Sequence, residues 1–299
     1  MKLSYYIRIH YTCILYTCIH NIDMIYYFYK IRGGSKMVRV ITINNFKGGV
    51  SKTSTTNGIA YILAEKMNKK VLVIDLDPQA DATETLLLTY NKKPKNDLYK
   101  TLKSNEDINY CLTKLSEKMD LIPSSFNMIG FPVLLEEMGF NRTSGASVIN
   151  NLIKPIKNNY DYVLIDTPPT ISDYSSNAIY ACDYSLIVMQ THRRSYRAVS
   201  SFIEYLALFK DIYQVDFEIA GILPVMFKKS GKVDKQVLKD SIDKYEDYLF
   251  TSYVYQRDRV KLWDETGITD EDFHDKNTLK MYYNITENLL NEIHTYESE

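Results

Sequence analysis

The sequence predicts an α/β fold with a doubly wound, mostly parallel sheet that has helices on both faces. Short apolar runs alternate with helical patterns from Met37 onward, which is typical of βαβ units. These runs are apolar at almost every position, as expected for strands that helices cover on both sides. The expected strands are residues 38–44, 71–75, 121–123, 162–166, 185–190 and 219–225, with a weaker candidate at 250–255.

Helical patterns fill the intervals between these strands. The first expected helix follows a glycine pair, and the last carries an apolar stripe at helical spacing, formed by Tyr282, Ile285, Leu289 and Ile293. No repeat, low-complexity tract or linker interrupts the pattern, so a single domain over residues 37–299 is expected. The expected helices are residues 53–67, 80–87, 97–102, 108–118, 131–138, 146–153, 173–180, 196–209, 233–248 and 277–293.

The composition is that of an ordinary globular protein. The chain has 299 residues, of which 45% are hydrophobic and 24% charged, and its net charge is −1. Bulk charge therefore gives no sign of nucleic-acid binding, and any such binding must come from a local patch. The four cysteines (Cys13, Cys18, Cys111 and Cys182) form no C-x-x-C pair. The cysteines therefore suggest no disulfide framework or zinc site, which fits a reducing cytoplasm.

Residues 1–36 differ from the rest of the chain. They hold seven of the 26 tyrosines, and charged or polar residues such as Arg8, His20 and Asp23 interrupt every apolar stretch. No stretch reaches the roughly 20 apolar residues that a membrane span needs. The codons of Arg32-Gly33-Gly34 could form a ribosome-binding site shortly before Met37. We therefore expect residues 1–36 to be an untranslated or disordered leader, dispensable for folding and function.

Residues 40–53 read Val-Ile-Thr-Ile-Asn-Asn-Phe-Lys-Gly-Gly-Val-Ser-Lys-Thr, a strand that turns through a glycine pair into a helix. Backbone N–H groups at such a turn can cradle a phosphate, and the helix dipole adds attraction. Lys52 would reach the β- and γ-phosphates and the Thr53 hydroxyl would hold Mg²⁺. The strict G-x-x-x-x-G-K-[ST] pattern fails, because Phe46 and Ser51 occupy the glycine positions. If position 51 needs a positive φ, serine costs on the order of 1 kcal/mol there.

Acidic residues follow two other predicted strands. Asp75 and Asp77 end the first, in Asp-Leu-Asp-Pro-Gln, and Asp166 ends the second, in Ile-Asp-Thr-Pro-Pro. The carboxyl ends of parallel strands are where open α/β sheets bind ligands, and a carboxylate beside phosphate needs a cation. A single Asp after a strand is more often a helix cap or turn residue. The order of the three motifs favours a nucleotide site.

Together these motifs resemble the deviant Walker A motif of the ParA/MinD family of P-loop ATPases, in which a second lysine precedes the glycines. The resemblance implies ATP and Mg²⁺ as cofactors and hydrolysis of ATP. It makes Lys47 a catalytic residue that acts across a homodimer, and Asp77 the residue that orients the attacking water. It assigns Mg²⁺ to Thr53, Asp75 and Asp166. The implied nucleotide contacts are Lys47, Gly48, Gly49, Val50, Ser51, Lys52, Thr53, Ser54 and Met226.

The chain resembles the short, Soj-like class, because only about 44 residues precede the phosphate loop and leave no room for a helix-turn-helix domain. This class implies a DNA partition ATPase, cytoplasmic and nucleoid-associated. It would dimerise on ATP, bind non-specific DNA and be stimulated by a ParB-like centromere-binding protein.

The alternative is a MinD-like membrane ATPase, which needs a basic C-terminal amphipathic helix. The last 20 residues hold one Lys against four Glu, so no membrane partner is expected. The iron–sulfur reductase branch of the family requires a cysteine pair, and the tyrosine autokinase branch carries a terminal tyrosine cluster. This sequence shows neither feature.

Two basic clusters late in the chain are the candidate DNA contacts. Non-specific DNA binding rests on phosphate contacts of this kind. The alternative is a solvated loop balanced by Asp234, Asp258 and Asp264. Arg193, Arg194 and Arg197, at the start of a helix, could serve DNA or a protein partner. The candidate DNA contacts are Lys228, Lys229, Lys232, Arg257, Arg259 and Lys261.

Overall fold

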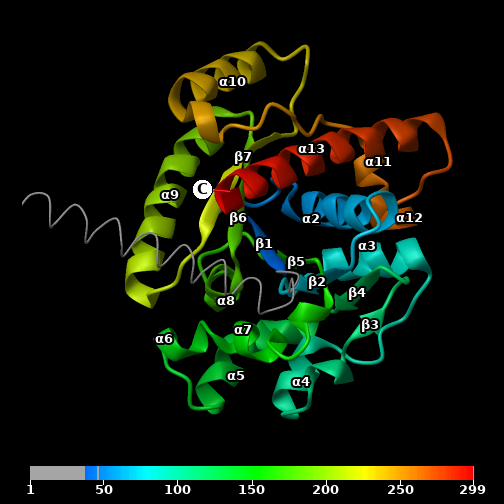
Figure 1. Cartoon of the computed structure of the whole chain (residues 1–299), viewed down its shortest axis with the longest axis vertical. Coiled ribbons are helices and arrows are strands. Elements are labelled where there is room, and N and C mark those ends of the chain that lie inside the picture. Colours follow the sequence, from blue (N-terminus) through cyan, green and yellow to red (C-terminus); the bar gives the residue numbers. More distant parts are fainter. Residues whose placement is uncertain (1–37, 46, 299) are drawn as a thin grey trace, which may run out of the picture. The chain divides into compact units, whose positions relative to one another are not determined.

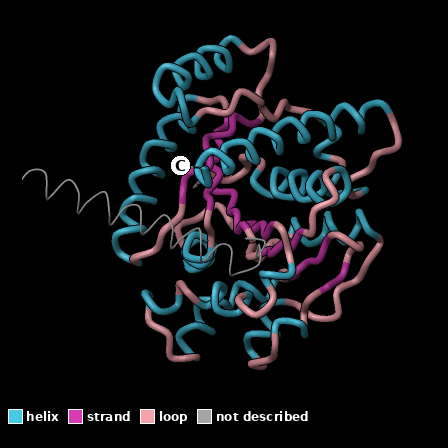
Figure 2. The backbone as a smooth tube through the Cα atoms, viewed as in Figure 1, coloured by secondary structure: helices cyan, strands magenta, loops and turns pink. Residues whose placement is uncertain are grey.

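The structure is a computed structural model that describes residues 38–45 and 47–298. The described residues form a seven-stranded sheet in the order β3-β4-β2-β5-β1-β6-β7 (magenta in Figure 2). Every neighbouring pair is parallel except β3 and β4, so the predicted mostly parallel sheet is confirmed. The strands are β1 (Arg39–Asn44), β2 (Val71–Asp75), β3 (Thr113–Lys114), β4 (Met119–Ile122), β5 (Tyr162–Asp166), β6 (Tyr184–Gln190) and β7 (Glu218–Val225).

Helices connect the strands and cover the sheet (Figure 1). The α-helices are α2 (Lys52–Tyr61), α3 (Asp81–Tyr90), α4 (Leu98–Lys103), α5 (Phe131–Glu137), α6 (Arg142–Gly145), α7 (Val148–Ile153), α8 (Asp173–Ala181), α9 (Arg193–Tyr213), α10 (Lys232–Tyr245), α11 (Asp258–Lys261), α12 (Trp263–Thr266) and α13 (Phe273–Ser298). A π-helical turn, η1 (Ile62–Lys66), extends α2, and 3₁₀ turns lie at η2 (Ile108–Tyr110), η3 (Phe126–Gly130), η4 (Lys157–Asn159) and η5 (Glu246–Tyr248).

Each face of the sheet carries its own hydrophobic core. Successive side chains of a strand point to opposite faces. In β1, Val40 therefore joins the core beneath α5, α7, α8 and α9, whereas Ile41 and Ile43 join the core beneath α2 and α13. This division confirms the doubly wound arrangement that the fully apolar strands predicted. The leader predicted at residues 1–36 lies outside the described residues.

The strand order brings the three predicted motifs to one edge. β1 pairs with β5 on one side and β6 on the other, and β2 pairs with β5 so that Asp75 lies beside Asp166. The strands are parallel, so the loops after β1, β2 and β5 all leave from the same end of the sheet. The phosphate loop and the carboxylates therefore meet at a topological switch point, where ligands bind in such sheets.

Two predicted elements are wrong. Residues 108–118 form no helix in the structure, but the turn η2 and the edge strand β3. Ile108 and Cys111 enter one core while Leu115 enters the other, so the chain crosses the sheet edge instead of burying one helical stripe. Residues 250–255 form no strand: the N–H groups of Phe250 and Val254 donate to Ile222 O and Pro224 O of β7 at 2.9 Å, without a continuous ladder. Pro224 of β7 has no N–H to extend a ladder there.

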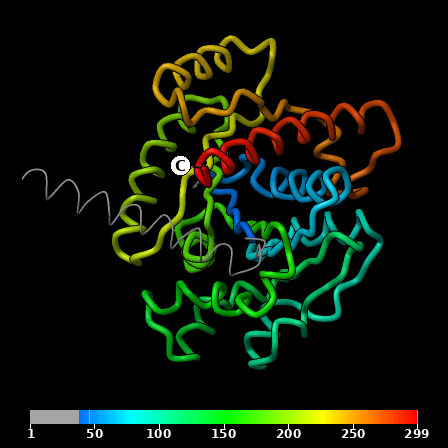
Figure 3. Tube along the Cα trace, viewed as in Figure 1, coloured from blue at the N-terminus to red at the C-terminus, as the bar shows by residue number. Residues whose placement is uncertain are grey.

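The C-terminal helix α13 packs against α2, far from it in sequence (red against blue in Figure 3). The contact depends on Gly58 of α2, because a Cβ there would lie 2.6 Å from the ring of Tyr282. Tyr282 is fully buried and its ring centroid lies 5.2 Å from that of Trp263 in α12. Gly58 therefore sets how closely the two helices approach.

Gly58→Ala should destabilise the protein. Overpacking against a wedged ring costs about 1–3 kcal/mol, which exceeds the gain of up to about 1 kcal/mol in helix propensity. Chemical denaturation measures the loss. In a Tyr282→Leu background, which frees the space, the same substitution should be neutral or stabilising. An equal loss in both backgrounds would contradict this explanation.

Candidate active site

The phosphate loop has the backbone of an anion cradle. It follows β1, and it turns through Gly49 at φ 67° and Ser51 at φ 58° before α2 begins at Lys52. Ser51 is therefore in the left-handed region, and the strain considered for this position is present. Such strain in a non-glycine residue costs roughly 1–2 kcal/mol and tends to gather at functional sites. The glycine at position 48 lies against Pro169, whose ring a Cβ would meet at 3.5 Å.

Lys52 provides the cationic group at the loop. The residue is only 6% exposed, and this burial lowers the pKa of its ammonium, while Asp166 and Asp77 act in the opposite direction. A partly desolvated ammonium at a helix N-terminus attracts an anion strongly, because little water must be removed when the anion binds.

Two fully buried carboxylates lie beneath the loop. Burial and the neighbouring Asp166 raise the pKa of Asp75 to about 8, and burial raises the pKa of Asp166 to about 6. Asp166 accepts hydrogen bonds from Thr53 Oγ1 at 2.8 Å and Thr56 Oγ1 at 3.2 Å. With a pKa of about 8, Asp75 holds a proton near neutral pH, so the negative charge beneath Thr53, the predicted Mg²⁺ ligand, is mainly that of Asp166.

Asp75 holds the loop after β2 in place. Its Oδ1 accepts a hydrogen bond from Asp77 N at 2.9 Å, and its Oδ2 accepts from Thr83 N at 2.9 Å and Thr83 Oγ1 at 2.7 Å. Both oxygens are therefore used by the chain itself. The geometry gives Asp75 a positioning role, and its predicted role as a metal ligand stays a prediction.

A pocket of about 540 Å³ opens over these groups. It brings together the predicted residues Asp77, Thr167 and Pro169 with the loop residues Gly49, Val50, Ser51, Lys52, Thr53 and Ser54. Sequence analysis missed other lining residues: Asn57, Asp81, Thr85, Val260, Trp263 and Asp264. Asn57 is 1% exposed, and its amide has no hydrogen-bond partner among the described residues. It lies one helical turn after Thr53, a spacing that identifies the shared face.

Lys47 points elsewhere. Its Nζ donates to Gln190 Oε1 at 2.8 Å and to Ser195 Oγ at 3.2 Å, at the end of β6 and the start of α9. It does not line the pocket of its own loop as that pocket is described. Met226, the other outlying nucleotide contact predicted, has φ 56° and packs partly buried against the core beneath α2 and α13. The described lining of the pocket does not include it.

The predicted DNA contacts fall into two groups. Lys228, Lys229 and Lys232 are exposed, and Lys229 Nζ lies 4.7 Å from the ring centroid of Tyr255. Arg259, by contrast, pairs with Asp272 and with the buried Asp275.

Arg257 and Lys261, the other two predicted DNA contacts near Arg259, are also engaged with nearby parts of the fold. Lys261 pairs with Asp258 at 2.9 Å and lines the phosphate-loop pocket, and Arg257 is half-buried. The group around Arg259 is thus tied into the fold, whereas the lysine loop is free to meet an external anion.

The C-terminal helix offers no apolar face to a membrane. Tyr282, Ile285, Leu289 and Ile293 are all at most 2% exposed, so their stripe is core packing, as predicted. Among the described helices, none is both long enough and apolar enough to cross a bilayer.

Comparison with known proteins agrees with this site. The model of the AAA domain family matches residues 38–219. The chain belongs to this family. The sporulation initiation inhibitor protein Soj of Bacillus subtilis (strain 168) is 26% identical to it over 230 residues, which are 75% of this chain and 87% of Soj. The motifs predicted a ParA/Soj-like ATPase, and these matches confirm that prediction.

This AAA domain protein is also similar in fold to solved structures. A putative plasmid partition protein from Borrelia burgdorferi B31, bound to AMPPNP, has a TM-score of 0.68 and 25% identity, covering 86% of this chain and 100% of that one. Cobyrinic acid a,c-diamide synthase from Mycobacterium smegmatis, with an ATP analogue and magnesium, has a TM-score of 0.71 and 22% identity, covering 85% and 94%. Nucleotide and magnesium therefore occur at sites on this fold.

The buried pair of carboxylates predicts a pH dependence. Because folding raises the pKa of Asp75 from an ordinary value of 3.8 to about 8, the folded state holds this proton more tightly than the unfolded chain. The stability that this contributes is complete below about pH 4 and is lost as the pH rises through about 8. The stability of the wild type should therefore fall relative to Asp75→Asn over this range.

Thermal unfolding without nucleotide, from pH 5 to 8, measures this difference. The asparagine amide also changes the hydrogen bonds at this position, but that effect on stability does not vary with pH. The informative quantity is therefore the slope with pH of the difference in stability between the two proteins. Asp211→Asn, at an exposed site, is the control. A difference between wild type and Asp75→Asn that is flat with pH would mean that folding does not raise the pKa of Asp75.

Proposed function

We propose that this protein is an ATP-dependent DNA partition ATPase, acting in the cytoplasm on the nucleoid. It dimerises on ATP, binds DNA non-specifically and is stimulated by a ParB-like centromere-binding protein. The observation that carries the proposal is the site at the carboxyl edge, where a left-handed loop and a partly desolvated Lys52 line one pocket, and the buried Asp166 accepts a hydrogen bond from Thr53 of that lining.

The residues present fit a nucleotide-bound Mg²⁺. This ion prefers oxygen ligands and usually takes one or two carboxylates together with phosphate oxygens. Thr53 Oγ1 and Asp166 supply such oxygens side by side, and burial keeps the pKa of Asp166 raised although Thr53, Lys52 and Thr56 act in the opposite direction. Among the described residues, no group of three or more His, Cys, Asp or Glu side chains forms a complete metal site, as expected if phosphate completes it. Mg²⁺ would neutralise phosphate charge there.

The chain's own groups divide the work of hydrolysis. Lys52 and the loop N–H groups bind the phosphates, and Asp77 orients the water that attacks the γ-phosphate in line. Asp77 suits this role because its backbone is fixed from both sides. Its N–H donates to Asp75, and its carbonyl accepts from Ser124 Oγ at 2.6 Å. Asp77 lines the pocket, and its Oδ1 accepts a hydrogen bond from Gln79 N at 2.9 Å.

Lys47 completes the site of a partner copy. In the single chain its ammonium is held by Gln190 and Ser195, away from its own phosphates. Dimerisation on ATP would exchange these two neutral acceptors for a phosphate, which is the stronger partner for an ammonium. The exchange makes dimer formation depend on the γ-phosphate.

DNA binding is assigned chiefly to the exposed lysines that precede and begin α10. Each phosphate neutralised by Lys228, Lys229 or Lys232 adds affinity without regard to sequence. Arg259 contributes less, because its guanidinium is already paired with Asp272 and Asp275.

The trans lysine gives the first test. Lys47→Ala should bind ATP as a monomer but neither dimerise nor hydrolyse it, since its own loop retains Lys52. Size-exclusion chromatography with a slowly hydrolysed analogue measures the dimer, and Gln190→Ala, which removes only a neutral acceptor, is the control expected to dimerise. An unchanged dimer in Lys47→Ala would contradict the proposed role of Lys47 in the site of the partner copy.

Asp77 gives the second test. Asp77→Ala should bind ATP and dimerise but lose hydrolysis, by about 10²-fold or more, because positioning and proton handling fail together. Lys52→Ala should instead lose nucleotide binding. Phosphate release measures turnover and a fluorescent analogue measures binding. Hydrolysis at the wild-type rate in Asp77→Ala would refute the role.

DNA binding gives the third test. Changing Lys228, Lys229 and Lys232 together to Glu should abolish binding of random duplex by the ATP form and leave ATP binding intact. Each lost phosphate contact should reduce the log–log salt slope by roughly 0.9. The matched control makes the same change at Lys92, Lys93 and Lys95, three exposed lysines of another loop. Equal effects of the two triple variants would leave only net charge as the explanation.

A further inference from the structure

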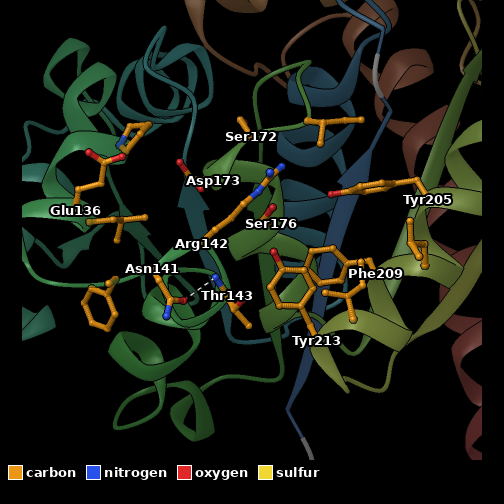
Figure 4. Close-up of a pocket in the computed structure, with 16 residues that line it drawn as sticks. Glu136, Asn141, Arg142, Thr143, Ser172, Asp173, Ser176, Tyr205, Phe209 and Tyr213 are labelled. Carbon is orange, nitrogen blue, oxygen red and sulfur yellow. Dashed lines mark hydrogen bonds between the residues drawn. The ribbon is translucent and has the colours of Figure 1, made fainter.

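A second cavity, of about 650 Å³, lies away from the phosphate loop (Figure 4). One wall comes from α5, α6 and the residues between them, and the opposite wall from α9. Figure 4 shows Glu136 on the first side, and Tyr205, Phe209 and Tyr213 on the other. The start of α8, with Ser172, Asp173 and Ser176, closes one end. We call this cavity the α5–α9 groove.

Large aliphatic side chains border the groove while exposed to water. Ile171 is 53% exposed, and Leu208 and Ile212 of α9 are each 56% exposed. Leu208 and Ile212 lie one helical turn apart and form a short ridge. The core-facing side of α9 is supplied by other residues, Phe202, Leu206 and Phe209. The ridge is therefore not needed for folding, and exposed apolar groups gathered at a cavity mark a binding surface.

The charges around the groove are mainly acidic. Glu136 and Asp173 line it, and Glu204 and Asp211 are exposed on α9 one turn to either side of Leu208. Arg142 is the single basic residue among those described as lining it. Lys210, the nearest lysine on α9, is paired with Asp216 at 3.4 Å and Glu218 at 3.3 Å. An occupant with apolar side chains and a basic flank would match both features.

The groove adjoins the segment that follows the catalytic strand. Ile171, Ser172 and Asp173 begin one residue after the Thr167–Pro169 stretch, in which Thr167 and Pro169 line the phosphate-loop pocket. Pro169 lies against Gly48 of the phosphate loop. Ser172 fixes this segment to α8 through a capping box. An occupant that presses on Ile171 thus acts on a short segment that reaches the phosphate loop.

We propose that the α5–α9 groove is the docking site for an amphipathic helix with a basic face, presented by a partner protein, and that its occupancy alters ATP turnover. The apolar side chains of the helix fill the groove between Phe140 and Leu208, and its lysines or arginines face Glu204 and Asp211. This is the helix-in-groove mode of recognition. The coupling to turnover rests on the proposed ATPase function, whereas the docking does not.

A model peptide tests the docking. The probe is a fluorescent peptide with the sequence Leu-Lys-Lys-Leu-Leu-Lys-Leu written twice, and the same peptide with Glu for Lys is the charge control. Fluorescence anisotropy on the full chain should show that the lysine peptide binds and the glutamate peptide does not. Leu208→Glu with Ile212→Glu should weaken binding by about tenfold or more, as expected when two anchors are lost. The matched control is Val233→Glu with Ile242→Glu, two exposed aliphatic residues of α10, which should bind as the wild type.

A charge reversal separates specific docking from general attraction. Glu204→Lys with Asp211→Lys should weaken the lysine peptide and admit the glutamate peptide. In the wild type the lysine peptide should also change the rate of phosphate release, and this effect should vanish in the Leu208 and Ile212 variant while its basal rate stays unchanged.

The outcomes divide cleanly. Peptide binding that ignores the groove substitutions, or equal binding of both peptides, overturns the docking site even if ATP is hydrolysed. Specific binding that leaves the rate of phosphate release unchanged overturns the coupling. Absence of any ATP hydrolysis in the wild type overturns the proposed function and leaves the binding result standing.

Discussion

The pairing of β2 with β5 places two fully buried carboxylates, Asp75 and Asp166, side by side, and the rest of the site is arranged around this unfavourable pair. Two like charges in a low dielectric repel strongly, and burial together with Asp166 therefore raises the pKa of Asp75 to about 8. The protein offsets part of this cost with donors from two helices. Thr53 and Thr56 tie α2 to Asp166, and Thr83 ties α3 to Asp75. The charge that awaits a cation thus also fixes the helices that form the walls of the pocket.

Backbone strain gathers at the same edge. Ser51 follows β1, Ala80 follows β2 and Met226 follows β7, and all three have φ near 56–59° without being glycine. Elsewhere in the described chain, positive φ falls on asparagines, one glutamine and glycines, and Asn and Gly adopt it more readily. Three strained residues after three strands of one sheet cost on the order of 1 kcal/mol or more each. Such a cost is retained where the loops must present N–H groups or side chains to a ligand, and this agrees with the location of the pocket.

The sequence predicted the elements that depend on local residue patterns. It did not predict the features that depend on contacts between distant segments. The fully buried strands and the loop around Lys52 are local, because burial on both faces and a glycine turn leave direct signatures. The helix expected at residues 108–118 failed because an i, i+3, i+7 apolar spacing also suits a chain that crosses the edge of a sheet and feeds both cores. The partners of Lys47 on β6 and α9 could not be read, since they lie about 145 residues away in sequence. The α5–α9 groove needs four separate elements and has no local signature.

Helix α9 connects the contact of Lys47 with the α5–α9 groove. Its first turn holds Ser195, which accepts from Lys47, and the same turn exposes Arg194 and Arg197. Its last turns carry Leu208 and Ile212 at the groove. Phe202, Leu206 and Phe209 pack this 21-residue helix into the core, and a close-packed core does not deform continuously. Release of Lys47 at one end and docking at the other therefore act on the same helix. If groove occupancy and release of Lys47 are coupled through α9, the coupling is reciprocal. Occupancy of the groove then changes the equilibrium for release of Lys47 by the same factor as release changes the affinity of the groove.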